Sequence, residues 1–255
     1  MKIGYALYSA REECRDPESL FRTLQALAQM GYDGVEFYGY AGTPAAMLKK
    51  ELEHCGIQGI STHIPAERWH FAPEEFDYAA EAGIPFVTFP WLAPDARTRT
   101  VYDRLEEAFP RLIRLCAERG LRMQYHNHDW EFAKGGRLMD SLLMCSPELM
   151  HEPDTFWMHY AGTEPCAYLR RRRDRIAMIH IKDYTSLREP RFCAIGEGLM
   201  DNAAIVKTAA ELRIPWVIVE LDDSPLPPLE SAASSLRYVR SAVSSLSLCL
   251  EAVQT

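Results

Sequence analysis

The sequence lacks an apolar run long enough to cross a membrane. A bilayer-spanning helix needs roughly 20 consecutive apolar residues, and no run in these 255 residues approaches that length. The opening segment, MKIGYALYSAREE, carries a single lysine and turns acidic almost at once, unlike a secretory signal peptide. We therefore expect a soluble, cytoplasmic protein with no membrane partner.

The sequence also lacks the paired cysteines of a disulfide framework or a structural zinc site. Its seven cysteines are odd in number, never occur as CxxC, and are scattered over the chain: Cys14, Cys55, Cys116, Cys145, Cys166, Cys193 and Cys249. We expect most of these thiols to be reduced and several to pack as small apolar side chains.

Positive charge is scarce. Lysine and arginine number 28 against 36 acidic residues, which gives a formal net charge of −8. Proteins that bind a phosphate backbone need clustered cations. The one basic run, Arg170 to Arg173 with Arg175, is expected to be a solvated helix end. We therefore predict no nucleic-acid partner.

A repeated strand–helix unit is what the sequence does contain. Asp16-Pro17 is a helix start signal and Gly31 a stop signal, and Thr43-Pro44 with Gly56 bound the next helix in the same way. Helices are predicted over 17–30, 44–55, 73–82, 98–119 with a kink at Pro110, 165–173, 202–212 and 229–250. Short apolar segments are predicted as strands over 3–6, 34–37, 59–62, 86–89, 122–125, 149–152, 177–181 and 216–219.

Regular alternation of strands and helices is typical of a parallel sheet. About eight such units in a chain of this length favour closure into a single (β/α)₈ TIM barrel, with residues 1–255 forming one domain. An open, doubly wound sheet is the structural alternative, but no GxGxxG follows the first strand to indicate a dinucleotide site.

Polar side chains stand where the predicted strands end, which is where a TIM barrel places its active site. A buried group of imidazoles and carboxylates is costly unless something compensates it, and a divalent cation does so. Mixed nitrogen and oxygen ligands favour Mn, Co, Mg, Fe or Zn over a thiolate-bound metal. The strand-end residues are Glu36, His63, His126, His128, Asp154, His180, Lys182 and Glu220, with Glu131 slightly beyond its strand.

Several motifs resemble the xylose-isomerase-like TIM-barrel family, usually labelled sugar phosphate isomerases/epimerases. They are YHNHDWEF at 125–132, DTFW from Asp154, IHIKDY at 179–184, IGEG at 195–198 with Asp201, and VIVELDD at 217–223. HIP after the third strand and PWL after the fourth are also similar to the family. The resemblance covers nearly the whole chain, in order and at compatible spacing.

The resemblance implies one divalent metal, commonly held by Glu, Asp, His and Glu on strands five to eight. The last three ligands fall on Asp154, His180 and Glu220. At the first position many relatives have Glu, whereas this chain has His126, with Glu131 as a less favoured ligand. A second departure is Glu152-Pro153 before Asp154, where similar relatives usually carry an apolar residue.

The implied reaction is an isomerisation or epimerisation of a small sugar-like substrate. A metal acting as a Lewis acid on a keto-sugar or related polyol makes the neighbouring C–H acidic and stabilises an enediolate. We expect His128 or Glu131 to move the proton, with Glu220 acting from the metal. Lys182 neutralises either a substrate oxyanion or acids of the site. Substrate contacts are predicted for Glu36, His63, Trp91 and Trp157, with Trp69 and Trp130 also in or near the mouth loops.

Other functions remain open at this stage. The same site serves a dehydratase or lyase of a keto-inositol or 3-keto-glycoside, and His126 at the usual Glu position leaves open a non-catalytic sugar-binding barrel. Apurinic-site endonucleases share this barrel but need more metal ligands and a basic DNA face, which this acidic chain lacks. Self-association into a homo-oligomer is an expectation from the resemblance.

Overall fold

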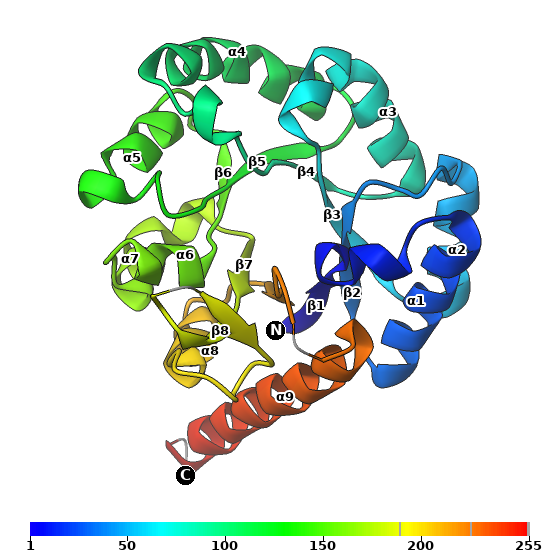
Figure 1. Cartoon of the computed structure of the whole chain (residues 1–255), viewed down its shortest axis with the longest axis vertical. Helices are drawn as coiled ribbons and strands as arrows, with labels where there is room; N and C mark the ends of the chain where they lie inside the picture. The colour runs from blue at the N-terminus through cyan, green and yellow to red at the C-terminus, as the bar shows by residue number, and fades with distance from the viewer. Residues whose placement is uncertain (189, 225, 254–255) are drawn as a thin grey trace.

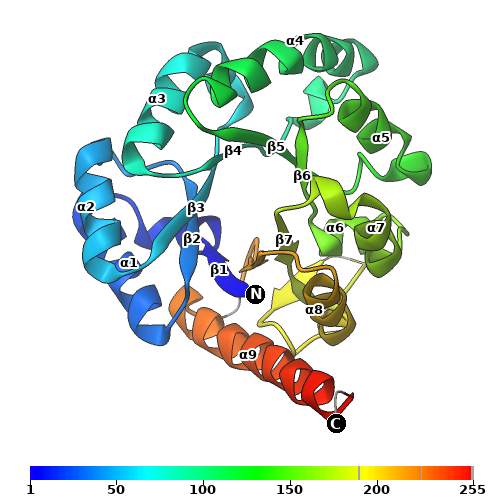
Figure 2. The same cartoon turned by 180° about the vertical axis from the view of Figure 1, so that it is seen from behind.

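The computed structural model describes residues 1–188, 190–224 and 226–253, with side chains except at 134 and 245–253. Its centre is a ring of parallel strands surrounded by helices, as Figures 1 and 2 show from the two sides. The strands are β1 (Lys2–Ala6), β2 (Gly34–Tyr38), β3 (Gln58–His63), β4 (Phe86–Phe89), β5 (Arg122–His126), β6 (Met150–Glu152), β7 (Met178–Ile181) and β10 (Trp216–Val219). The predicted TIM barrel is confirmed.

The ring closes between β6 and β7 by a sparser connection than elsewhere. Hydrogen bonds run continuously through the order β6-β5-β4-β3-β2-β1-β10-β7. Between the two ends, isolated bridges join His151 to Ile176 and Asp154 to His180. The backbone N–H of His180 donates to the carbonyl of Pro153 at 2.8 Å. The closing junction therefore includes two of the predicted metal ligands.

The helices follow the predicted start and stop signals with one exception. Asp16 caps α1 through its side chain, and Gly31, Gly56 and Gly83 end helices in the left-handed conformation. Thr43 was expected to cap α2, but Pro44 occupies the cap position without a side-chain hydrogen bond. The α-helices are α1 (Pro17–Met30), α2 (Ala45–Cys55), α3 (Ala72–Ala82), α4 (Arg99–Ala117), α5 (Arg137–Met144), α6 (Thr155–Tyr160), α7 (Pro165–Arg172), α8 (Asn202–Glu211) and α9 (Pro228–Val253).

Several smaller elements lie outside the sequence prediction. Helix α5 lies between β5 and β6 and completes the alternation of strands and helices, whereas α6 and the hairpin of β8 (Asp183–Ser186) and β9 (Arg191–Cys193) are additions to it. Pro110 lies inside α4, which continues through it. Short 3-10 segments are η1 (Leu7–Glu13), η2 (Ala66–Phe71), η3 (Pro94–Ala96), η4 (Ala133–Gly135) and η5 (Arg173–Arg175).

Strand side chains alternate between two environments, as the period of two requires. In β7, Ile179 and Ile181 belong to the large core between the sheet and the helices. Met178 belongs instead to a small separate cluster with Ile60, Met150 and Ile218. These residues precede the carboxyl ends of their strands. The barrel interior is therefore apolar toward the amino ends of the strands and polar at their carboxyl ends.

Three expectations from composition can be compared with the structure. In the described part of the chain, no helix combines the length and apolar character that a membrane crossing requires. Cys116 and Cys193 are buried free thiols, and the side chain of Cys249 lies outside the described residues. In the basic run, Arg170 pairs with Glu211, while Arg175 donates to the carbonyls of Leu149, Leu143 and Ser146.

Candidate active site

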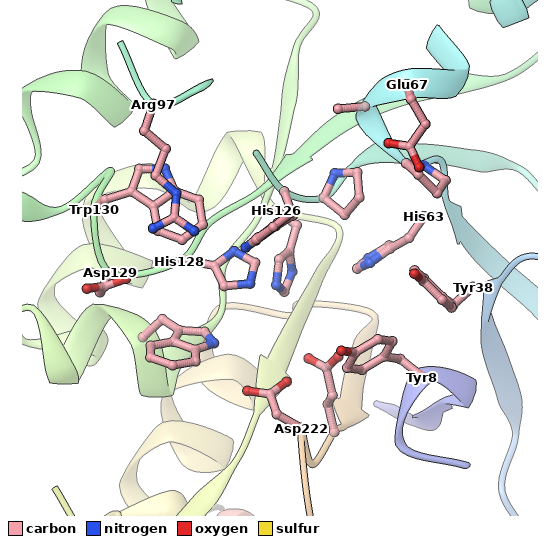
Figure 3. Close-up of a pocket in the computed structure, with 16 residues that line it drawn as sticks. Tyr8, Tyr38, His63, Glu67, Arg97, His126, His128, Asp129, Trp130 and Asp222 are labelled. Atoms are coloured by element: carbon pink, nitrogen blue, oxygen red, sulfur yellow. The ribbon is translucent and has the colours of Figure 1, made fainter. Parts of the chain in front are cut away.

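A cavity of about 550 Å³ opens at the carboxyl ends of the strands (Figure 3). Predicted site residues on its wall are His63, Trp91, His126, His128, Trp157 and Glu220. Most lie at strand ends or just beyond them, because the strands of a parallel barrel all deliver their carboxyl ends to one face. The convergence of these residues into one mouth was predicted from the sequence.

Four side chains at the base of this cavity form a group that we name the outer cluster: His126 and Glu220, which line the cavity, and Asp154 and His180. Each offers one nitrogen or oxygen atom, and these four atoms lie within 4.8 Å of one another. All four residues are buried. The cluster coincides with the metal ligand set expected from the resemblance to the family.

The outer cluster has the chemistry of a metal site. Glu220 Oε2 lies 2.7 Å from His180 Nδ1, and Asp154 Oδ2 lies 3.9 Å from His126 Nε2. Two buried carboxylates therefore face two imidazole nitrogens, and buried charges of this kind are paired or coordinate metals. Two imidazoles and two carboxylates suit borderline or hard divalent ions. The residues present therefore fit a metal ion.

Asp154 is oriented by its neighbour Asn127, which is completely buried. The side-chain oxygen of Asn127 accepts from the backbone N–H of Asp154 at 2.9 Å and also lies 3.0 Å from Nε2 of His151. Because Pro153 cannot donate to the strand ladder, β6 ends at Glu152. The side chain of Asn127, the residue after β5, thus holds the backbone of Asp154 in place.

Lys182 lies against the acids of the site. Its Nζ atom lies 3.0 Å from Asp154 Oδ2, 3.0 Å from Glu220 Oε2 and 2.8 Å from Asp222 Oδ1. Burial lowers the pKa of this amine, but the three carboxylates outweigh burial and raise it well above its usual value. The structure shows the ion pairs of Lys182 with these acids, and its role toward a substrate oxyanion stays a prediction.

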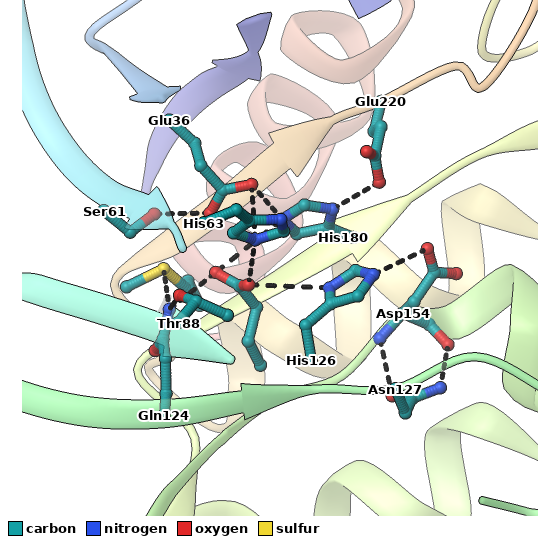
Figure 4. A network of polar contacts seen from close by, with 12 residues as sticks. Glu36, Ser61, His63, Thr88, Gln124, His126, Asn127, Asp154, His180 and Glu220 are labelled. Carbon is teal, nitrogen blue, oxygen red and sulfur yellow. Dashed lines mark hydrogen bonds and ion pairs between the residues drawn. The ribbon is translucent and has the colours of Figure 1, made fainter. Parts of the chain in front are cut away.

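A second group, which we name the inner cluster, lies deeper in the barrel (Figure 4). It consists of His63, His126, Glu152 and His180, and it also satisfies the distance requirements of a metal site. Glu152 Oε2 lies 2.8 Å from His63 Nε2 and 3.5 Å from His126 Nδ1. The sequence analysis noted Glu152 only as a departure before Asp154 and did not place it in the site.

The charges of the inner cluster and of the neighbouring Glu36 compensate one another. Burial alone would lower the pKa of His63, but Glu36 and Glu152 raise it to about 10. Burial raises the pKa of Glu36, and His180 and His63 reverse this so that it falls well below its usual range. Paired in this way, buried carboxylates and imidazolium groups are mutually compensated.

The family of this protein follows from the agreement of sequence and geometry. The model of the xylose isomerase-like TIM barrel family matches residues 24–242, a segment that contains both clusters. The chain belongs to this family.

Two of the three similar proteins described below carry enzyme names. An inosose dehydratase of Geobacillus kaustophilus is 24% identical over 247 residues, covering 80% of each chain. A structure of a sugar phosphate isomerase/epimerase from Parabacteroides distasonis superimposes with a TM-score of 0.77 at 24% identity, over 93% of this chain and 92% of that one. The IOLI protein with a bound zinc atom gives a TM-score of 0.75 at 15% identity, over 96% and 99%.

Two residues predicted for this family member's site lie elsewhere. Glu36 was expected to hold substrate hydroxyls, but it is buried beneath the cavity and contacts His63 and His180 at 3.0 and 2.9 Å. Glu131 was expected to move a proton, but it is not on the cavity wall. Its carboxylate accepts from Tyr125 at 2.6 Å and from the backbone N–H of His128 at 2.9 Å. Glu131 therefore supports the loop that carries His128.

Aromatic side chains form part of the cavity wall, as the sequence predicted for Trp91 and Trp157. Trp130 stacks on the ring of His128 with an interplanar angle of 11°. Trp69 is the exception, because it is buried and donates its indole N–H to the carbonyl of Ile64 at 2.7 Å. Trp69 packs against the barrel and does not line the cavity.

Arg97 is a wall residue that the sequence analysis missed. Its guanidinium carbon lies 3.4 Å from the ring centre of Trp130, and its Nε donates to the carbonyl of Leu92 at 2.9 Å. Figure 3 shows it at the mouth beside Trp130. No sequence signal identifies it, since it lies in an irregular loop. Asp222, also missed, is two residues after Glu220, and this period of two was a usable signal.

Proposed function

We propose that this protein is a metal-dependent isomerase or epimerase of a keto-sugar or related polyol. The reaction is a proton transfer next to a carbonyl group through an enediolate. One observation carries the proposal: the outer cluster, with the chemistry of a metal site, borders a cavity of about 550 Å³ walled by histidines, carboxylates and tryptophans. Aromatic rings suit the C–H faces of a sugar, and convergent polar groups fix its hydroxyls.

The metal would be held by His126, Asp154, His180 and Glu220. A divalent ion in that place supplies Lewis acidity toward a substrate carbonyl and lowers the energy of negative charge on oxygen. Mn, Co, Mg, Fe and Zn all accept such ligands, and the zinc atom of the IOLI protein supports zinc among them.

The proton is handled by Glu220 and His128, which come from different sides of the barrel. Glu220 follows β10 and His128 follows β5, with β7 and β6 between these strands in the ring. Both side chains lie on the cavity wall. One group removes the proton and the other returns it, either to the opposite face of the same carbon or to the next carbon. The first outcome is epimerisation and the second isomerisation.

Dehydration of a keto-inositol is the second candidate. Similarity to the Geobacillus kaustophilus inosose dehydratase favours it. Asp222 lies on the same wall as Glu220, so that a second carboxyl group is available to protonate a departing hydroxyl. Both candidates begin with the same proton abstraction and differ only in the group that leaves or returns.

The first test is elemental analysis of the purified parent and of the His180→Ala and Glu220→Ala variants. Glu211→Ala is the matched control, because Glu211 is half exposed and pairs only with Arg170 in the described ion pairs. We expect near-stoichiometric divalent metal in the parent and control and its loss in both site variants. A parent that binds no metal, even after Mn or Co is supplied, refutes the proposal.

The second test follows solvent deuterium uptake into ketohexoses, ketopentoses and a keto-inositol. Exchange into a ketose with formation of its epimer or aldose supports the main proposal. Loss of water from the keto-inositol, without exchange into any ketose, supports the dehydratase instead. No exchange into any of these compounds by the metal-loaded parent contradicts both.

A further inference from the structure

We propose that Glu152 and Glu36 are positioning residues that set the tautomers of His126 and His180, so that a single metal ion occupies the outer cluster. The inner cluster is then its hydrogen-bonding support and not a second metal site. This inference rests on the proposed metal dependence and adds roles for two buried carboxylates that the reaction itself does not use.

The two clusters share His180 through opposite ring nitrogens. Its Nδ1 lies 2.7 Å from Glu220 Oε2 in the outer cluster. Its Nε2 lies 2.9 Å from Glu36 Oε1 and 3.7 Å from Glu152 Oε1. The ring therefore presents one nitrogen to Glu220 and the other to Glu36, as Figure 4 shows.

The two clusters also share His126, but here Nε2 faces the outer cluster and Nδ1 faces the inner cluster. Its Nε2 faces Asp154 Oδ2 at 3.9 Å, and its Nδ1 faces Glu152 Oε2 at 3.5 Å. His126 and Glu152 are direct register partners on β5 and β6, so the backbone holds this pair together. The two histidines thus turn different nitrogens, Nε2 and Nδ1, toward the outer cluster.

A neutral imidazole has one N–H and one free lone pair. A carboxylate that accepts the N–H at one nitrogen leaves the lone pair at the other free to bind a metal. Filling both clusters at once would require His126 and His180 to lose both ring protons and bridge two ions. One ion per chain is the arrangement that neutral imidazoles allow.

The oxygen atoms decide which cluster takes the ion. In the inner cluster, Glu152 Oε1 accepts from Gln124 Nε2 at 2.7 Å and Oε2 contacts His63 at 2.8 Å. Glu36 Oε2 accepts from Ser61. In the outer cluster, by contrast, Asp154 Oδ2 and His126 Nε2 are 3.9 Å apart, which is beyond hydrogen-bond distance, so that both atoms can turn a lone pair toward an ion between them. The outer cluster also borders the cavity, so that an ion there is accessible to a substrate.

The experiment compares variants that belong to one cluster only. His63→Gln alters the inner cluster and Asp154→Asn alters the outer cluster. Glu152→Gln removes the negative charge and replaces one acceptor oxygen with an NH2 donor, with little change in shape. Zinc stoichiometry and affinity are measured by chelator competition, and folding is checked by circular dichroism. We expect one zinc per chain in the parent and in His63→Gln, loss of zinc in Asp154→Asn, and 10- to 100-fold weaker binding in Glu152→Gln.

Nitrogen-15 NMR of the histidine rings in zinc-loaded protein gives a readout that a merely structural role would not change. The proposal requires His180 bound through Nδ1 with a proton on Nε2, and His126 bound through Nε2 with a proton on Nδ1. In Glu152→Gln the His126 pattern should weaken or become mixed, while that of His180 persists through Glu36.

The outcomes separate this inference from the proposed function. Two zinc ions per chain, loss of zinc in folded His63→Gln but not in Asp154→Asn, reversed tautomers, or unchanged affinity in Glu152→Gln each overturn the inference alone. A parent that binds no zinc, manganese or cobalt overturns both.

Discussion

Replacing Lys182 with Met should destabilise the metal-free protein severely. Lys182 is 1% exposed, and its Nζ lies within 3.0 Å of carboxylate oxygens of Asp154, Glu220 and Asp222. Methionine preserves most of the length of the side chain but removes the only cation that contacts all three acids among the described ion pairs. Three carboxylates then remain close together in a largely buried place.

The magnitude follows from the burial of these charges. Breaking a buried ion pair by removing one partner costs about 3–5 kcal/mol, because the remaining charge is uncompensated. Asp154 and Glu220 are almost fully buried, whereas the side chain of Asp222 is 25% exposed and contributes less. We therefore expect a loss within that range at pH 7. The loss should shrink as the pH falls, because protonation relieves the repulsion among the carboxyls.

Urea denaturation in the presence of a chelator measures this loss. Arg170→Met is the matched control, since it removes a pair with Glu211 whose side chains are 52% and 47% exposed. An exposed pair contributes less than about 1 kcal/mol. A Lys182→Met loss no greater than that of the control, or one that does not change between pH 7 and pH 5, would refute the reasoning.

Three further predictions concern other parts of the molecule. Burial raises the pKa of Glu131 from 4.5 to about 7, so its contribution to stability is full below pH 4.5 and is lost as the pH rises through 7. Urea titrations at several pH values give the free energy of unfolding as a function of pH, and Glu131→Gln should remove about 3 kcal/mol of its pH dependence. The same pH dependence in parent and variant would contradict this prediction. Gly196→Ala places a methyl group in the ring of Tyr238 at a φ of +91°, whereas Gly56→Ala, at +67°, meets open space. The former should cost about 1–3 kcal/mol more in thermal unfolding, and equal losses would count against the contact. Once a substrate is known, Arg97→Met should raise KM about tenfold or more with little change in kcat, because hydrogen bonds from a charged donor contribute about 1.5–3 kcal/mol. An unchanged KM would exclude Arg97 from binding.

The fold was predictable because it depends on local signals that the chain repeats. Gly31, Gly56 and Gly83 end helices where a left-handed residue is needed, and apolar strands follow each of them. Helix α5 and the β8–β9 hairpin were not predicted. Their short segments lie within connections, where turn geometry and packing against the barrel outweigh periodicity.

The sequence predicted which residues form the site better than it predicted how deep in the barrel each side chain lies. Sequence position shows which residues end a strand, and it correctly grouped His126, Asp154, His180 and Glu220. It does not show how deep a polar side chain lies, so it did not reveal that Glu36 lies off the cavity wall against His63 and His180. Two departures from the family pattern, His126 and Glu152, were noted separately, although they face each other in register across β5 and β6. Strand pairing made them neighbours, and a single sequence does not reveal that pairing.

The sparse junction between β6 and β7 has a consequence for how the barrel responds to ions. Asp154 and His180 lie on its two sides and are joined by one of the two isolated bridges there. An ion bound to both side chains would cross-link the least hydrogen-bonded joint of the ring and stabilise the closed form by mass action. Amide hydrogen exchange along β6 and β7 measures how often this joint opens. Slower exchange would then report that metal is bound, even in the absence of any substrate.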